Sequence, residues 1–129
     1  MRTLEIHRLE GSESFSTPEG IITPIFASQK ISVMNIKLPA GLKVNPHSHN
    51  EDGILVVTTG AVRLTGDSTI DLKTGDLVYI SGNTSAGLEC DEAATALAIS
   101  VPSNYKNVEE LCNVLRSFFA SDGSVPGGN

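Results

Sequence analysis

Hydrophobic and polar residues alternate along most of this chain in short runs, which are separated by turns rich in glycine. Alternation sends successive side chains to opposite faces of an extended backbone, so each run predicts a short β-strand with one buried face. We expect strands at residues 21–26, 31–38, 53–59, 61–65, 69–73, 77–81 and 93–101. Short strands at near-even spacing, with turns between them, are typical of a β-sandwich or β-barrel.

The N-terminal part of the chain carries weaker signals. Residues 3–9 alternate weakly and predict an edge strand, whereas residues 11–20 combine serine, glycine and proline and predict a surface loop. Pro24 lies inside the next predicted strand, where it favours an edge position or a β-bulge.

The periodicity changes from strand to helix near the C-terminus. Asn107 is a suitable N-cap, and Glu110 follows in the capping-box position. Apolar residues then recur at helical spacing, at Val108, Leu111, Cys112, Leu115, Phe118 and Phe119. The pattern predicts one helix at about 107–120 that packs outside the sheet or on a second subunit. Residues 1–121 would form a single domain, and residues 122–129, rich in glycine, would form a flexible tail.

Composition and charge narrow the function classes. The chain has 129 residues, enough for one domain with a sizeable core, and 40% of them are hydrophobic. The net charge is −6 and lysine and arginine do not cluster, which argues against binding to nucleic acid or to an anionic membrane surface. The N-terminus lacks the apolar core of a signal peptide, and no apolar run is long enough to cross a bilayer. Cys90 and Cys112 suggest no disulfide framework, so we expect reduced thiols and a cytoplasmic protein.

The strongest chemical signal is a pair of histidines, His47 and His49, within residues 41–60. On one strand both side chains would point to the same side, and two imidazoles on one side can bind one metal ion. An H-x-H pair also occurs on exposed loops, so the pair by itself does not establish a site.

The sequence around this pair resembles the first motif of the cupin family, G-x5-H-x-H-x3-4-E-x6-G. The matching positions are Gly41, His47, His49 and Gly60. Gly75 opens a partial match to the second motif, G-x5-P-x-G-x2-H-x3-N, and the resemblance covers roughly residues 30–102. It implies an all-β fold, the antiparallel double-stranded β-helix or jelly-roll barrel of cupins, here with one C-terminal α-helix. It also implies a homodimer, which open edge strands near the N-terminus favour as well.

The chain departs from both motifs at positions that bind metal in the family. Gly53 stands at the position of the motif glutamate, and the second-motif proline, glycine and histidine positions are Ser81, Asn83 and Ala86. Two of the four usual protein ligands are therefore absent. The candidates for a third ligand beside the two histidines are Glu51, Asp52 and Cys90. The resemblance implies a divalent transition metal such as zinc, nickel, iron or manganese, and a thiolate ligand would favour zinc or copper.

The same register predicts the residues of an interior pocket. These are His47, His49, Gly53, Leu55, Val57, Tyr79, Ala86, Leu88 and Cys90. Gly53 in place of a carboxylate would remove charge and open space. Simpler interpretations remain for some of them: Cys90 as a small buried hydrophobic residue, Tyr79 as a packing residue, and Glu51 with Asp52 as a solvated turn.

Two functions follow from this pocket. The first, which we favour, is a binding module that holds a small molecule and has lost complete metal chemistry. The alternative is a metal-dependent enzyme of the isomerase, lyase or dioxygenase type, with His47 and His49 as ligands. Without metal, one of the two histidines could still act as a general acid or base.

Overall fold

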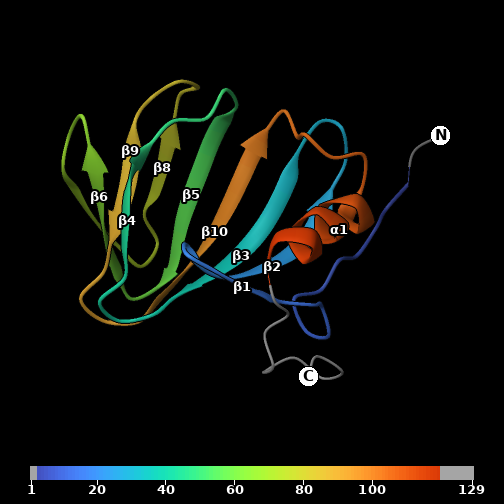
Figure 1. Cartoon of the computed structure of the whole chain (residues 1–129), viewed down its shortest axis with the longest axis horizontal. Helices are drawn as coiled ribbons and strands as arrows, with labels where there is room; N and C mark the ends of the chain where they lie inside the picture. Colours follow the sequence, from blue (N-terminus) through green and yellow to red (C-terminus); the bar gives the residue numbers. More distant parts are fainter. Residues whose placement is uncertain (1–2, 120–129) are drawn as a thin grey trace.

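The protein consists of two antiparallel β-sheets that face each other, with one helix beside them; the computed structural model describes residues 3–119 (Figure 1). The larger sheet has the strand order β1-β2-β3-β10-β5-β8, and the smaller has the order β4-β9-β6-β7. The strands are β1 (Phe15–Thr17), β2 (Gly20–Ala27), β3 (Ser32–Leu38), β4 (Lys43–His47), β5 (Asp52–Thr59), β6 (Ala61–Gly66), β7 (Ile70–Lys73), β8 (Leu77–Ile80), β9 (Ala86–Glu89) and β10 (Ala94–Val101). This architecture confirms the predicted all-β jelly-roll barrel with a helix at its C-terminal end.

The predictions for the first 20 residues are wrong in two places. Residues 3–9 form no strand, and Leu4 and Ile6 are fully or largely exposed, so the weak alternation there buries nothing within one chain. The first strand is β1, inside the predicted loop, where Phe15 pairs with Ile22 of β2 and is completely buried. The predicted bulge is present, because the pairing of β2 with β3 shifts register just after Pro24.

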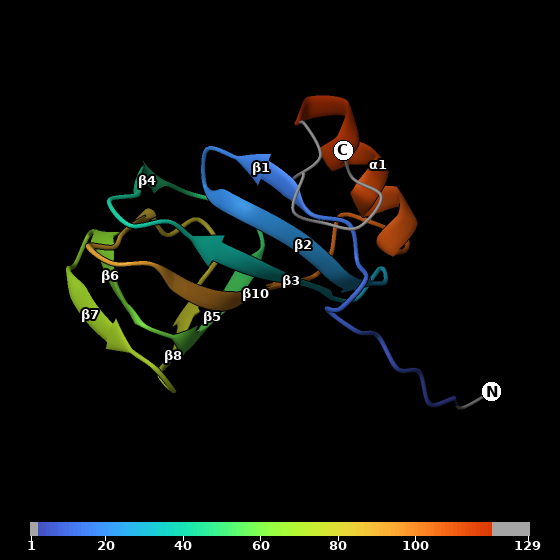
Figure 2. The same cartoon turned by 90° about the horizontal axis from the view of Figure 1, so that it is seen from below.

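One end of the barrel is filled by side chains. On neighbouring strands, Leu38 lies opposite Ala94, and Ala96 lies between Ile36 and Val57. All of these residues are buried, and further buried residues of the core are Val62, Leu72 and Cys90. Figure 2 shows the two sheets from below, with β6 and β7 opposite β5 and β8. The buried side chains of both sheets therefore fill this end of the barrel.

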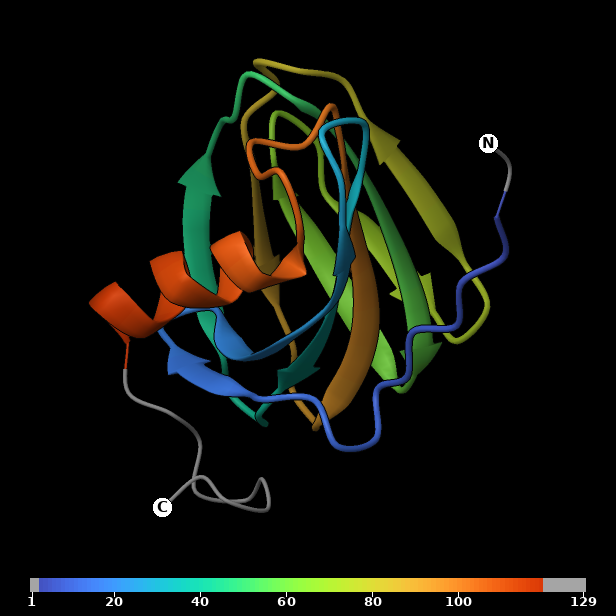
Figure 3. The same ribbon diagram turned by 90° about the vertical axis from the view of Figure 1, so that its right-hand side faces the viewer.

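The helix α1 (Val108–Phe118) packs against β2 at the side of the barrel (Figure 3). Its N-terminus is capped as the sequence predicted, because the Asn107 side chain accepts a hydrogen bond from the backbone N–H of Glu110. Leu111 and Leu115 are buried under the helix, whereas Phe118 is 75% exposed. The last predicted helical position, 120, and the predicted tail lie outside the described residues.

An ion pair holds the helix to the segment that precedes β1. Nη2 of Arg116 donates a hydrogen bond of 2.5 Å to Oε1 of Glu13, and the guanidinium lies 5.9 Å from the centre of the Phe15 ring. The helix is thus attached to both β1 and β2. Across residues 3–119, α1 is too short to cross a membrane and no other helix is present to do so.

Candidate functional site

A cavity of about 510 Å³ lies between the two sheets, toward the end of the barrel that is not filled. Two rows of paired residues form its wall on the larger sheet: Ser100 of β10 lies between Ser32 and Gly53, and Ala98 lies between Met34 and Leu55. Several of these side chains are small, and Gly53 has none, so the walls cannot meet across the space between the sheets. The volume is in the range of small-molecule sites.

The helix and the loop before it line part of the cavity. Leu111 and Leu115 of α1, together with Phe119, contribute apolar surface, and Tyr105 in the preceding loop contributes its ring. The sequence predicted the apolar face of the helix but could not say that this face borders the cavity. That placement depends on how the helix packs against β2.

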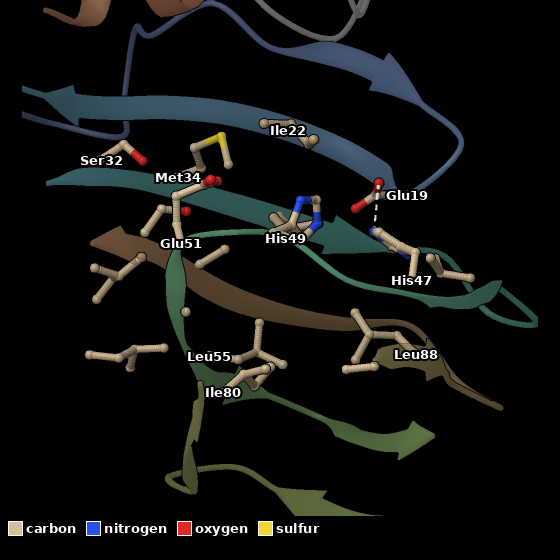
Figure 4. A pocket seen from close by; sticks show the side chains of 18 of the residues that line it. Glu19, Ile22, Ser32, Met34, His47, His49, Glu51, Leu55, Ile80 and Leu88 are labelled. Atoms are coloured by element: carbon tan, nitrogen blue, oxygen red, sulfur yellow. Dashed lines mark ion pairs between the residues drawn. The ribbon is translucent and has the colours of Figure 1, made fainter. Parts of the chain in front are cut away.

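His47 and His49 lie side by side on the wall of this cavity (Figure 4). Their ring centroids are 4.8 Å apart and the rings are nearly perpendicular, at 79°. His47 ends β4, whereas His49 lies in the loop that follows, so the two do not share one strand as predicted. The loop nevertheless brings both imidazoles to the same cavity.

The backbone around His47 fixes the orientation of its ring. Nδ1 of His47 lies 2.9 Å from the carbonyl oxygen of Asn45, and because a carbonyl oxygen only accepts, Nδ1 carries the hydrogen. The strand is held by a close approach to β9: a Cβ atom at Gly87 would lie 2.4 Å from the carbonyl oxygen of Val44. Only glycine allows this spacing of β4 and β9.

Glu19 is a cavity residue that the sequence analysis missed. It lies in the turn between β1 and β2, and its Oε2 atom is 3.8 Å from Nε2 of His47 (Figure 4). Residues 11–20 showed only the composition of a loop. No pattern within the chain indicates that this turn meets the end of β4, because the contact joins parts of the chain that are far apart in sequence.

The structure separates the three candidate third ligands. Glu51 lines the cavity near Tyr105. Burial raises the pKa of the Tyr105 hydroxyl, and the charge of Glu51 raises it further. Asp52 lies outside the cavity wall, where it accepts hydrogen bonds from the Tyr79 hydroxyl and, at 2.8 Å, from the backbone N–H of Gly82. These two bonds, the Tyr79 bond first, lower the pKa of Asp52.

Cys90 is buried in the core, away from the histidines. Its thiol donates a hydrogen bond of 3.2 Å to the carbonyl oxygen of Pro39, and Cys90 does not line the cavity. Cys90 directly follows β9, which ends at Glu89, and it packs in the buried core rather than on the cavity wall. Its position agrees with the simpler interpretation of a small buried residue.

The predicted pocket residues divide into two groups. Gly53, Leu55, Ala86 and Leu88 line the cavity together with the two histidines. Val57, Tyr79 and Cys90 do not. Val57 faces inward as predicted but is completely buried in the filled part of the core, and Tyr79 is 57% exposed on the outside of β8. The prediction for Tyr79 was wrong because Val78 and Ile80 form the inward face of β8. For Val57 the inward face was predicted correctly, but alternation does not show how far along a strand the cavity extends.

The described residues do not provide a complete metal site. Within residues 3–119 no group of three or more histidine, cysteine, aspartate and glutamate side chains could hold a metal ion. The two other ligand positions of the cupin motifs are Gly53 and Ala86, neither of which has a donor atom in its side chain. Two imidazoles are fewer than the three or four protein ligands of typical zinc sites.

No protein-family model and no curated protein matches the sequence. Solved structures do match the fold. An RmlC-like cupin from Shewanella frigidimarina NCIMB 400 aligns with a TM-score of 0.68 at 16% identity, over 72% of this chain and 86% of that chain. KdgF from a Halomonas species aligns with a TM-score of 0.65 at 18% identity, over 71% of this chain and 86% of that chain.

The alignment with a third solved structure extends over nearly all of that structure. An RmlC-like cupin protein from Desulfovibrio desulfuricans aligns with a TM-score of 0.64 at 20% identity, over 78% of this chain and 98% of that chain. At these identities the similarity establishes the fold alone. The chain has the cupin fold, as its resemblance to the cupin motifs implied.

Proposed function

We propose that this protein binds a small molecule in the cavity between its two sheets, with His47 and His49 as polar contacts on the cavity wall. The observation that carries the proposal is the cavity itself, with a volume of about 510 Å³ and both imidazoles on its surface. Filling this space with side chains would bury more apolar surface and stabilise the fold. A cavity of this size is therefore better explained by a ligand than by the needs of the fold.

The character of the walls supports an amphipathic ligand. The larger apolar side chains come from both sheets and from the helix, as Leu55, Leu88 and Leu111 illustrate. A few polar groups converge among them, which is the usual composition of a small-molecule site. The apolar walls would contribute affinity, and the imidazoles would orient a polar group of the ligand.

The proposal is tested by filling the cavity. Ala98→Phe would place a ring between Met34 and Leu55, and Leu97→Phe would place the same ring on the opposite face of β10. In a thermal-shift screen of small-molecule fragments, the wild type and Leu97→Phe should share stabilising compounds that no longer stabilise Ala98→Phe. Ala86→Phe, which fills the cavity from the other sheet, should behave like Ala98→Phe. Compounds that stabilise all four proteins equally would contradict binding in the cavity.

The alternative function is a metal-dependent enzyme of the isomerase, lyase or dioxygenase type. The observation in its favour is the contact between two imidazoles, His47 and His49. The incomplete set of protein donors places it second. Protein purified without a histidine tag should contain little zinc, nickel, iron or manganese. Near-stoichiometric metal that is absent from the His47→Ala/His49→Ala variant would make the enzyme the leading proposal.

We further infer a homodimer in the cytoplasm, without nucleic-acid or membrane partners. The exposed apolar residues Leu4 and Ile6 support a protein partner, and both described cysteines are free thiols, as a reducing compartment favours. The net charge of −6 supports the lack of interaction with polyanions.

A further inference from the structure

The charged side chains on the cavity wall determine which ligand charge the cavity favours. Among the described residues that line the cavity, Glu19 and Glu51 are the acidic ones, and lysine and arginine are not represented. With neutral histidines the lining therefore carries two negative charges and no positive one. An anionic ligand would be repelled by both carboxylates and would have no fixed cation to pair with.

Two hydrogen-bond acceptor atoms, one from His47 and one from Glu19, face each other on the cavity wall. Because Nδ1 carries the hydrogen, Nε2 of the neutral ring presents a lone pair, and this lone pair faces a carboxylate oxygen of Glu19 at 3.8 Å. Neither atom can donate to the other. A nitrogen donor at the usual hydrogen-bond distance of about 2.9 Å from both atoms fits this separation. An ammonium group has three N–H donors and can serve both acceptors at once.

Glu51 adds a second carboxylate on the opposite side of the cavity. Figure 4 shows Glu51 beside Met34, whereas Glu19 lies beside His47 at the other side of the view. After burial, the charge of Glu51 is the next cause that raises the pKa of the Tyr105 hydroxyl, so this charge acts within the partly buried space. The two carboxylates therefore make the interior favourable for a cation.

We propose, on the basis of the proposed binding function, that the ligand is an organic cation: an amine with an apolar body, whose ammonium group binds between Glu19 and Nε2 of His47. The apolar part would lie against Leu55, Leu88 and the helix. The charge-assisted hydrogen bond to Glu19 would make the cavity prefer an amine over a neutral ligand, since such bonds are shorter and stronger than neutral ones.

The test uses three probes that share one phenylbutyl group: 4-phenylbutylamine, 4-phenylbutanol and 5-phenylpentanoate. Binding is measured by calorimetry at pH 8 with a chelator present, so that histidines are ordinarily neutral and metal-mediated binding is suppressed. The amine should bind at least about tenfold more tightly than the alcohol, which is the effect of one charge-assisted hydrogen bond. The carboxylate should bind most weakly.

Variants identify the carboxylate that is responsible. Glu19→Gln should reduce the preference for the amine over the alcohol to near unity and leave binding of the alcohol unchanged. Glu92→Gln, which removes the same charge from the turn between β9 and β10, should keep the full preference. Because Glu19 is exposed in a turn, its substitution leaves the core intact.

The outcomes separate the two proposals. If the alcohol or the carboxylate binds as tightly as the amine, the cation inference is wrong while small-molecule binding stands. If the preference persists in Glu19→Gln, the ammonium position is wrong. If no probe binds the wild type, or if Ala98→Phe binds the probes as the wild type does, binding in the cavity is itself contradicted, and the inference with it.

Discussion

Gly53 decides, at the scale of a single residue, how much space and charge the cavity has. It lies on β5 directly opposite Ser100, at the position where the cupin motif has a glutamate. A Cβ atom there would lie 3.9 Å from the carbonyl oxygen of Ile99 and 4.0 Å from Cβ of Ile80, which are ordinary contacts. The backbone thus accepts a larger residue at this position, and the absence of the carboxylate is a property of the sequence rather than of the space.

The first prediction follows from this free space. Gly53→Glu should restore a carboxylate near His47 and His49, and we expect the affinity for Zn²⁺ to rise by about tenfold or more over the wild type. Titration with Zn²⁺ followed by calorimetry measures the change. Gly53→Gln is the matched control, since it adds the same bulk without an ionised ligand and should leave the affinity low. Equal affinities in wild type and Gly53→Glu would show that the two imidazoles do not face this position.

Asp52 gives the second prediction, which concerns pH. The hydrogen bonds from Tyr79 and Gly82 stabilise the ionised carboxylate and lower its pKa in the folded state. In the unfolded chain the pKa of an aspartate is about 3.9. The stabilisation from these hydrogen bonds is therefore fully present above that pH, and it is lost as the pH falls through the lower pKa of the folded state. Asp52→Asn should therefore be less stable than the wild type at pH 7, with a difference that narrows toward pH 2.

Urea denaturation at several pH values measures this difference. Tyr79→Phe removes the larger of the two causes and should reproduce part of the effect. Because Asp52 and Tyr79 lie outside the cavity, both variants should keep the probe affinities of the wild type. A stability difference between Asp52→Asn and wild type that does not change with pH would contradict the assignment of the shift to Asp52.

At the scale of elements, the contact between β4 and β9 positions the histidines. A Cβ atom at Gly87 would overlap the carbonyl oxygen of Val44, at 2.4 Å, and the nitrogen of Pro46, at 2.8 Å. The third prediction is that Gly87→Ala lowers the free energy of unfolding by about 2 kcal/mol or more, since the strands must separate to accept the methyl group. It should also weaken binding of the amine probe, because His47 ends β4.

The matched control for this prediction is Gly53→Ala. Its added methyl group makes only ordinary contacts, so its stability should stay within about 1 kcal/mol of the wild type. Urea denaturation of the three proteins gives the comparison. If Gly87→Ala is as stable as Gly53→Ala, the approach of β4 to β9 does not constrain the site.

The strands and the helix also show how much of the fold and of the cavity could be predicted from the sequence. Strands such as β3, β5 and β10 were predictable because alternation encodes a buried face, and α1 was predictable from its cap and apolar stripe. The extent of the cavity was not, because whether Leu55 borders space while Val57 is packed depends on residues across the barrel. The contact of Glu19 with His47 was equally hidden, since it joins a turn to a distant strand.

At the scale of the whole molecule, residues 3–9 bury little apolar surface within one chain, apart from the His7 ring, which lies 4.6 Å from the ring of Phe26. Leu4 is fully exposed and Ile6 is 76% exposed, although burial of each would stabilise the protein by about 2 kcal/mol. The sheet also has an exposed edge at β8, where Leu77 and Tyr79 are more than half exposed. An open edge can pair with a strand of another chain, and exposed apolar surface can be buried in a contact between chains.

The last prediction is therefore that two copies of the chain associate through this segment. Light scattering coupled to size exclusion should give twice the mass of one chain for the wild type. Leu4→Asp should shift the protein toward the monomer, because an aspartate cannot be buried in an apolar contact without a partner for its charge. Thr3→Asp adds the same charge one residue away and should leave the dimer intact if Leu4 itself is buried in the interface. A wild-type protein that is monomeric at micromolar concentration would contradict the homodimer. Dissociation of the dimer by both variants would indicate that the added charge, rather than loss of the Leu4 contact, separates the copies.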